Sequence, residues 1–164
     1  MPNKIYTARE TAITFADSAQ TPSYTITLSA LANGAGRISA QADRGAGSTA
    51  SWYRWRATIQ QATAGTVGNT FEIYVSTSDG TNPDGNEGVA DAALSAENKL
   101  KNMRLIGIVI ADLTTTNTNI TASGDCWIPT RYFSVVVWNR LGVALKTDTA
   151  VHSVKLTPIP DEVQ

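Results

Sequence analysis

Strict alternation of apolar and polar side chains is the feature that most constrains how this chain can fold. It is clearest in "WYRWRATIQ", where the two parities hold, respectively, Tyr53, Trp55, Ala57, Ile59 and Trp52, Arg54, Arg56, Thr58. Successive side chains of a β-strand point to opposite faces, so a period of two predicts a strand with one face in a core and the other outside. "TFEIYVS" repeats the pattern, with Phe71, Ile73 and Val75 inward.

Two further pairs of segments complete the predicted sheets. "SYTITLSAL" alternates with Tyr24, Ile26, Leu28 and Ala30 inward, and together with "RISAQA" it predicts a hairpin through "ANGAG". "RLIGIVIAD" and "RYFSVVVWN" are apolar on both parities. Continuous apolar runs of this length are typical of central strands covered on both faces, and we expect both segments in that position.

The remaining segments predict shorter elements. "TTTNTNITASGDCWIPT" favours one short strand around Ile120 and another around Trp127, ended by a proline. "VHSVKLTP" predicts a closing strand with Val154 and Leu156 inward. "VADAALSAENKLKNM" has helical spacing and predicts one or two helical turns.

The composition agrees with a chain made of strands and turns. Only 16% of the 164 residues are charged, and 22 are threonine, which favours strands over surface helices. A chain of this length suits one domain with its own core. We therefore predict a single all-β domain over residues 1–164, an antiparallel β-sandwich or jelly roll with at most one short helix. Residues 1–10 are expected to form an N-terminal arm and residues 158–164 a C-terminal tail.

Charge and cysteine content narrow the partners and the compartment. With 13 basic and 14 acidic residues the net charge is −1, so there is no global field to attract nucleic acid or an anionic membrane. The start lacks the apolar region of a secretory signal, and the apolar run "LIGIVIA" is too short to cross a bilayer. A lone Cys126 makes no internal disulfide, which fits folding in a reducing cytoplasm.

Residues for catalysis are scarce. The single histidine, His152, and Cys126 lie in no local signature of nucleophilic catalysis, and Cys126 is interpreted as a small buried hydrophobe. One histidine and one cysteine do not form a zinc cluster, and no phosphate-binding glycine loop is present. A pair of carboxylates far apart in the sequence stays open as an alternative. We predict a non-enzymatic protein without a cofactor.

The acidic loop "SDGTNPDGNEG" is the one candidate for a cation. Asp79, Asp84 and Glu87 supply carboxylates, but the spacing does not fit the helix-flanked calcium loop in either possible register. Asp-Gly and Pro-Asp-Gly are strong turn formers. We interpret the segment as a long exposed loop, with an irregular calcium site as the alternative.

The outward parity of "WYRWRATIQ" raises a second question, because it places Trp52 between exposed positions next to Arg54 and Arg56. These residues could be covered by another segment with the arginine stems along apolar surface. They could instead form a protein interface, where tryptophan and arginine are enriched, or a sugar platform together with Tyr74. Single-stranded nucleic acid fits poorly with a pI near 5.7. Among the functional alternatives we favour a protein partner.

Four segments, in order, resemble a family of small tailed-bacteriophage virion proteins described as head-decoration (cement) or structural proteins. They are "TITLSALANGAGRISAQADR", "FEIYVSTSDGTNPDG", "NMRLIGIVIAD" and "RYFSVVVWNRLGVAL", and the resemblance runs from about Tyr24 to Leu156. Because these segments are strands and turns, they identify a scaffold better than a chemistry. The resemblance implies a β-sandwich on the outer surface of the capsid, commonly a homotrimer, that ties neighbouring subunits of the major capsid protein together without catalytic residues.

This resemblance leads to specific expectations. The protein is expected to be made in the host cytoplasm and to reside in the virion, with the major capsid protein and copies of itself as partners, and without nucleic-acid or membrane contacts. The candidate contact residues are Trp52, Arg54, Arg56, Asn82, Asp84, Lys4 and Tyr6. The alternatives are a carbohydrate-binding β-sandwich module and a tail or fibre component of a virion.

Overall fold

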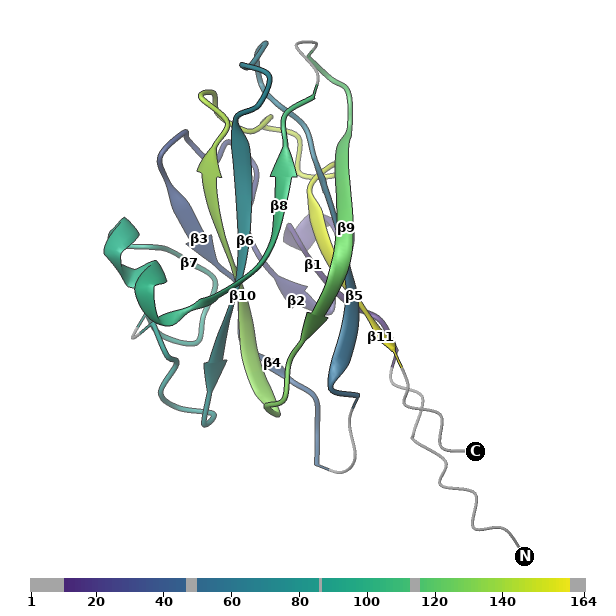
Figure 1. Cartoon of the computed structure of the whole chain (residues 1–164), viewed down its shortest axis with the longest axis vertical. Coiled ribbons are helices and arrows are strands. Elements are labelled where there is room, and N and C mark those ends of the chain that lie inside the picture. The colour runs from purple at the N-terminus through teal and green to yellow at the C-terminus, as the bar shows by residue number, and fades with distance from the viewer. Residues whose placement is uncertain (1–10, 47–49, 86, 113–115, 160–164) are drawn as a thin grey trace, which may run out of the picture.

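The computed structural model describes residues 11–46, 50–85, 87–112 and 116–159, which form two β-sheets packed face to face (Figure 1). The five-stranded sheet A has the order β2-β1-β11-β5-β9, with strands Tyr24–Thr25, Ile13–Ala16, Ser153–Ile159, Trp52–Ile59 and Ile120–Trp127. The six-stranded sheet B has the order β7-β3-β10-β6-β8, with strands Ala92–Ala93, Gly36–Ile38, Tyr132–Arg140, Thr70–Ser78 and Arg104–Ile110. A short β4, Ala42–Asp43, also pairs with β10. The predicted all-β sandwich is confirmed.

The main core lies between the sheets and is built from the inward parities of their strands. Tyr53, Ala57 and Ile59 of β5 are fully buried, and so are Phe71 and Ile73 of β6. The alternation predicted for both strands is therefore confirmed. Because each of these side chains removes its apolar surface from water, burial of this kind supplies most of the free energy that stabilises the fold.

Trp55 closes the sandwich where the edge strands β8 and β9 run side by side (Figure 1). Its indole lies over two glycines, one on each edge. A Cβ on Gly107 would lie 2.2 Å from the ring, and one on Gly124 would lie 2.8 Å from Nε1. Any side chain at either position would push the ring out of the seam. The two glycines thus let one tryptophan of sheet A reach sheet B.

A second, smaller core lies on the outer face of sheet B. The segment between β6 and β8 folds back over that face and carries β7 and a 3-10 helix, η2, at Glu97–Asn102 (Figure 1). Its Leu94, Leu100 and Met103 pack against Val136 and Trp138 of β10. We call residues 79–103 the cover. The predicted helical turns in this region are confirmed as η2, whereas a second 3-10 helix, η1 at Ser18–Gln20, was not predicted.

One prediction about strand pairing is wrong. The expected hairpin of "SYTITLSAL" and "RISAQA" does not form, because β2 belongs to sheet A and β3 to sheet B. Ile26 and Leu28 are buried as expected, but Ala30 is exposed, with a left-handed backbone at φ 57°. The chain crosses from one sheet to the other here, and a local alternation does not encode which sheet a strand joins.

Strand β8 is also different from its prediction. It was expected at the centre of a sheet but lies at the edge of sheet B, with Leu105, Ile108 and Ile110 between 41% and 58% exposed. Strand β10, by contrast, is central and buried on both faces, as predicted. The apolar run alone did not distinguish the two positions because it reports apolar side chains and not neighbours.

The third group of differences concerns strand length. The two short strands expected around Ile120 and Trp127 are one continuous strand, β9. β11 continues through Pro158 to Ile159, two positions into the predicted tail. Because β1 pairs with β11 only up to Leu156, the end of β11 has a single neighbour, and a proline is tolerated there. Among the described residues, no helix is long and apolar enough to span a membrane.

Candidate functional site

The outer face of sheet A is the candidate binding surface, and the strand registers arrange its side chains in rows. We call it the Trp52 face. Its apolar row is Trp127, Trp52 and Ile159, its middle row Asp125, Arg54 and Thr157, and its cation row Ser123, Arg56 and Lys155. Each row takes one residue from β9, one from β5 and one from β11, and neighbouring rows lie two residues, or about 6.6 Å, apart along the strands.

The apolar row leaves large side chains in water. Trp52 is 48% exposed, Trp127 43% and Ile159 36%. Trp52 and Trp127 are direct cross-strand partners, so their indoles share one patch. Arg104, the first residue of β8, places its guanidinium 5.2 Å from the centroid of the Trp127 ring, which is within cation–π range. The outward parity predicted for Trp52 is confirmed, and no described segment buries it.

The middle row contains an ion pair. Arg54 donates from Nε to Asp125 Oδ1 at 2.9 Å and from Nη2 to Oδ2 at 3.3 Å, a two-pronged arrangement. The hydrogen bond lowers the pKa of Asp125 and raises the pKa of Arg54. Both side chains are solvent exposed, so water screens the pair and it adds little stability. Arg54 is thus neutralised within its own row.

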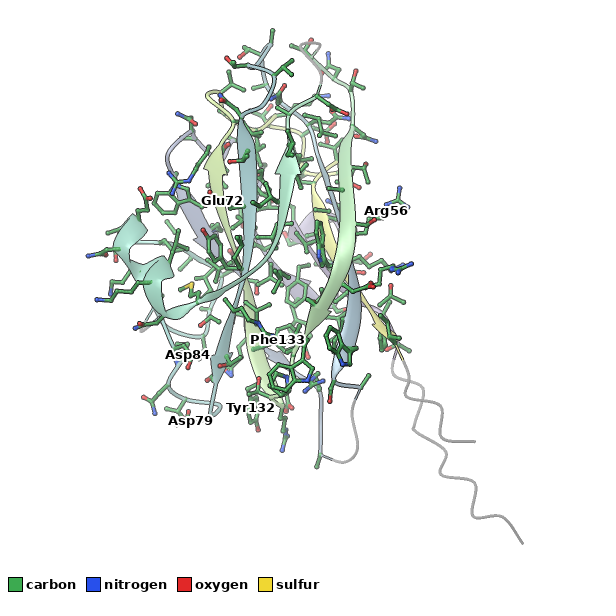
Figure 2. The ribbon with its side chains drawn as sticks, in the orientation of Figure 1. Arg56, Glu72, Asp79, Asp84, Tyr132 and Phe133 are labelled. Atoms are coloured by element: carbon green, nitrogen blue, oxygen red, sulfur yellow. The ribbon has the colours of Figure 1, made fainter. Side chains whose placement is uncertain are left out.

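The cation row is not neutralised. Arg56 and Lys155 are direct cross-strand partners and both are exposed. Among the described residues neither has an ion-pair partner. Like charges directly opposite each other on a sheet repel, so this pair costs the free protein stability. Figure 2 shows the Arg56 side chain extending outward from the sandwich, on the opposite side from Glu72, Asp79 and Asp84.

Two other predicted contact residues, Asn82 and Asp84, lie in the acidic loop after β6. Figure 2 shows that Asp84 does not join the Trp52 face. Asp79 accepts from the backbone N–H groups of Asn82 at 2.7 Å and Thr81 at 2.8 Å, which lowers its pKa to about 2. Asp84 accepts from the backbone N–H and the hydroxyl of Thr77. These bonds hold a turn, as the loop interpretation expects.

The third carboxylate of the loop region points elsewhere. Glu87 accepts from the Ser95 hydroxyl at 2.8 Å and lies 3.4 Å from the Lys99 ammonium, so it links the first part of the cover to η2 in its second part. Within the described part of the chain, no three histidine, cysteine or acidic side chains gather where they could hold a metal ion. The loop therefore supplies no cage built from its three carboxylates.

His152 and Cys126 both serve as structural groups. The His152 ring is fully buried, and its Nδ1 accepts from the backbone N–H of Gln60 at 3.3 Å, so Nε2 carries the proton and donates to the Lys146 carbonyl at 2.9 Å. Burial lowers the pKa of His152 and raises the pKa of the Cys126 thiol to about 11. Cys126 packs in the main core.

The alternative sugar platform, made by Trp52 together with Tyr74, does not form. Tyr74 lies on the outer face of sheet B, packs against the core beneath the cover and donates to Glu72 at 2.7 Å. The ring that does neighbour Trp52 is Trp127, which the sequence interpretation missed. The alternation of buried Cys126 with Trp127 was the available signal, but it spans too few residues to be read without the register. Lys4 and Tyr6 lie outside the described residues.

Two hollows in the described surface lie away from the Trp52 face. One of about 310 Å³ is bounded by β1, β2 and β4, with Tyr24, Asp43 and Arg44 in its wall. The side chains of this wall are already engaged, since Asp43 accepts from Arg131 at 2.6 Å and Arg44 donates to Tyr53 at 2.8 Å. A second hollow, of about 240 Å³, lies beside η2. The Trp52 face itself is the surface of a sheet, which suits a large partner better than a small molecule.

Comparison with known proteins adds no relative. No family model, no curated protein and no solved structure matches this chain.

Proposed function

We propose that this protein is a non-enzymatic structural component of a phage virion, a decoration protein that binds the outer surface of the major capsid protein shell and stabilises it. The observation that carries the proposal is the Trp52 face, where two half-exposed tryptophans stand side by side with cations on a surface that no described segment covers. Large exposed apolar patches on soluble domains mark interaction sites. The resemblance of the strand and turn segments to head-decoration proteins names the shell as the partner.

The residue types of this face favour a protein partner. Tryptophan and arginine are the residues that most often dominate binding energy at protein interfaces. Trp52 and Trp127 would supply apolar anchors, and Arg56 and Arg104 would supply charge at the rim. Attachment of several copies to a symmetric shell would then multiply modest single contacts into a stable coat.

A second exposed strip supports contacts between copies. Leu105, Ile108 and Ile110 of the edge strand β8 are exposed, and they lie on sheet B rather than on the Trp52 face. Exposed apolar edge strands tend to pair or pack with another chain. We therefore place the self-contact of the proposed homotrimer at β8, which leaves the Trp52 face free for the shell.

A carbohydrate-binding module is the second candidate, and one observation favours it. The adjacent indoles of Trp52 and Trp127 form an open aromatic patch. Such rings also stack on sugar rings, because both surfaces are flat and apolar. A glycan array with the wild-type protein and Trp127→Ala tests this candidate. Binding of a defined glycan that the variant loses would favour it over the capsid.

Co-sedimentation with undecorated phage shells tests the main proposal. We expect saturable binding of the wild-type protein. The affinities of Trp52→Ala and Trp127→Ala for the shells should be lower by about tenfold or more, since anchors of this type contribute about 1.4 kcal/mol or more. Val67→Ala is the matched control, because Val67 is 59% exposed but lies off the Trp52 face. Absence of wild-type binding to the shells, with the protein folded, would contradict the proposal and move the choice to a tail component or a glycan.

A further inference from the structure

Arg56 stands apart from the other arginines that the structure describes. Arg37, Arg54, Arg131 and Arg140 each pair with an acidic side chain. Arg44 donates to backbone carbonyls and to Tyr53, and Arg104 lies over the Trp127 ring. Arg56 has no such partner in the described part of the chain, and its two cross-strand neighbours are Ser123 and another cation, Lys155. Two unpaired cations side by side on an exposed sheet favour the binding of an anionic group from a second molecule.

We infer that the Trp52 face recognises an acidic segment of its protein partner, with a carboxylate held by Arg56 and Lys155 and an apolar side chain held by Trp52 and Trp127. This inference rests on the proposed function, because it names the chemistry of the surface to which the protein binds. A guanidinium and an ammonium together match a carboxylate in both charge and geometry, since the planar guanidinium can donate two parallel hydrogen bonds.

The spacing of the rows defines the segment more closely. Arg56 lies four positions from Trp52 on the same strand, which is about 13 Å at 3.3 Å per residue. An extended peptide lying along β5 would place side chains at positions i and i+4 over these two rows. The row between them is closed by the Arg54–Asp125 pair, so it favours a small polar side chain at position i+2. The expected partner segment therefore has an apolar residue and an acidic residue four positions apart.

The same face is poorly suited to nucleic acid. Specific and non-specific binding to phosphates both need several cations along a track. Here the unpaired cations are limited to Arg56 and Lys155 within the three rows, and the Arg54–Asp125 pair between them and the tryptophans carries no net charge. A partner with one or two well-placed carboxylates matches this distribution better than a continuous line of phosphates.

Charge reversal at Arg56 separates a binding role from a structural one. In Arg56→Glu the new carboxylate would face Lys155, so the free protein should keep or raise its urea midpoint while its affinity for undecorated shells falls by about tenfold or more. Lys101→Glu is the matched control, because Lys101 is exposed on η2, within the cover over sheet B, and carries the same charge change. We expect the control to bind like the wild type.

The outcomes distinguish this inference from the proposed function. Failure of the wild-type protein to bind shells would overturn the proposed function and the inference with it. Wild-type binding that Arg56→Glu leaves unchanged, or that salt between 50 and 500 mM does not weaken, would overturn the acidic partner while the decoration role stands. Titration of the protein with polyanions, followed by tryptophan fluorescence, supplies a direct readout because Trp52 and Trp127 are exposed at the proposed contact. Poly-L-glutamate should bind in an Arg56-dependent way, whereas Arg56-dependent binding of heparin or single-stranded DNA alone would contradict the inference.

Discussion

Both outer faces of the sandwich carry tryptophan side chains, which are exposed on one face and buried on the other. On sheet A, Trp127 and Trp52 remain 43% and 48% exposed, whereas on sheet B the comparable Trp138 is 5% exposed beneath Leu100 and Met103 of the cover. The strands already differ, because β10, which carries Trp138, is apolar on both parities, whereas β5, which carries Trp52, alternates. The cover, a separate segment, packs on the outer face of sheet B around Trp138, whereas no described segment buries Trp52 or Trp127.

An aromatic residue on the outer face of a sheet is either buried by another segment of its own chain or left exposed. Trp138 stabilises the fold because a segment of its own chain buries it. Trp52 and Trp127 retain apolar surface that a second molecule could remove from water, at roughly 25 cal/mol per Å². If the proposed function holds, stability and binding are carried by tryptophans on opposite faces, and mutations can separate the two roles.

The largest expected effect compares tryptophan with tryptophan. Trp138→Ala should lower the free energy of unfolding by about 3–5 kcal/mol, because it empties a packed core beneath the cover. Trp127→Ala should lower it by less than about 1 kcal/mol, because that ring is already half exposed. Urea denaturation followed by circular dichroism measures both. Equal losses would show that the Trp52 face is part of the folding core.

A smaller effect compares two leucines. Leu100 of η2 is 8% exposed and Leu105 of β8 is 47% exposed. Leu100→Ala should cost about 2 kcal/mol and loosen the cover, so that a dye that binds apolar surface gains fluorescence. Because Leu105 belongs to the proposed self-contact, the control Leu105→Ala is measured on the monomer, where it should change neither stability nor dye binding measurably. A stable Leu100→Ala protein without increased dye binding would mean that the cover does not depend on this contact.

The third comparison concerns the ion pairs of the two faces. Asp91 lies in the cover and is largely buried; it accepts from Arg37 Nε at 2.6 Å and from the Thr27 hydroxyl at 2.6 Å. Burial raises the pKa of Asp91, but the hydrogen bonds from Arg37 and Thr27 outweigh it, and the net direction is downward. Asp91→Ala should cost about 1–2 kcal/mol by thermal denaturation. Asp125→Ala, on the open Trp52 face, should leave the melting temperature unchanged, and a matching loss there would break the contrast.

The smallest effect is a dependence on pH. His152 must stay neutral because a proton on Nδ1 would face the N–H of Gln60, and burial holds its folded pKa below the ordinary 6.5. Its contribution is therefore complete above pH 6.5 and is lost as pH falls through the folded pKa. We expect the stability to fall by less than about 1 kcal/mol between pH 7 and pH 6. His152→Ala should be less stable at pH 7 and flatter over this range; an equally steep slope would assign the pH dependence to another group.

Local sequence patterns predicted where the strands lie in the chain better than they predicted which strands lie next to each other. The alternation in β5 and β6 correctly placed Tyr53 and Phe71 in the core and Trp52 outside, because side-chain parity is a local property of a strand. The same patterns did not predict that β8 lies at an edge or that β2 and β3 belong to different sheets, because those features depend on contacts between distant segments.

The candidate site was predicted in part for the same reason. Trp52, Arg54 and Arg56 come from one strand, so their shared face could be read from the sequence. Trp127 and Lys155 come from strands about 70 and 100 positions further along the chain, and only the register brings them beside that strand. The loop residues Asn82 and Asp84 were predicted as contact residues together with these three, but the fold holds them in a turn away from the Trp52 face.

The most direct test of the account is a cryo-electron microscopy reconstruction of phage shells saturated with this protein. If the proposed function and the inferred acidic partner are right, sheet A faces the shell, with Trp52 and Trp127 at the contact. An acidic side chain of the capsid protein then lies beside Arg56 and Lys155. A reconstruction in which the cover over sheet B meets the shell, with the Trp52 face in solvent, would contradict it.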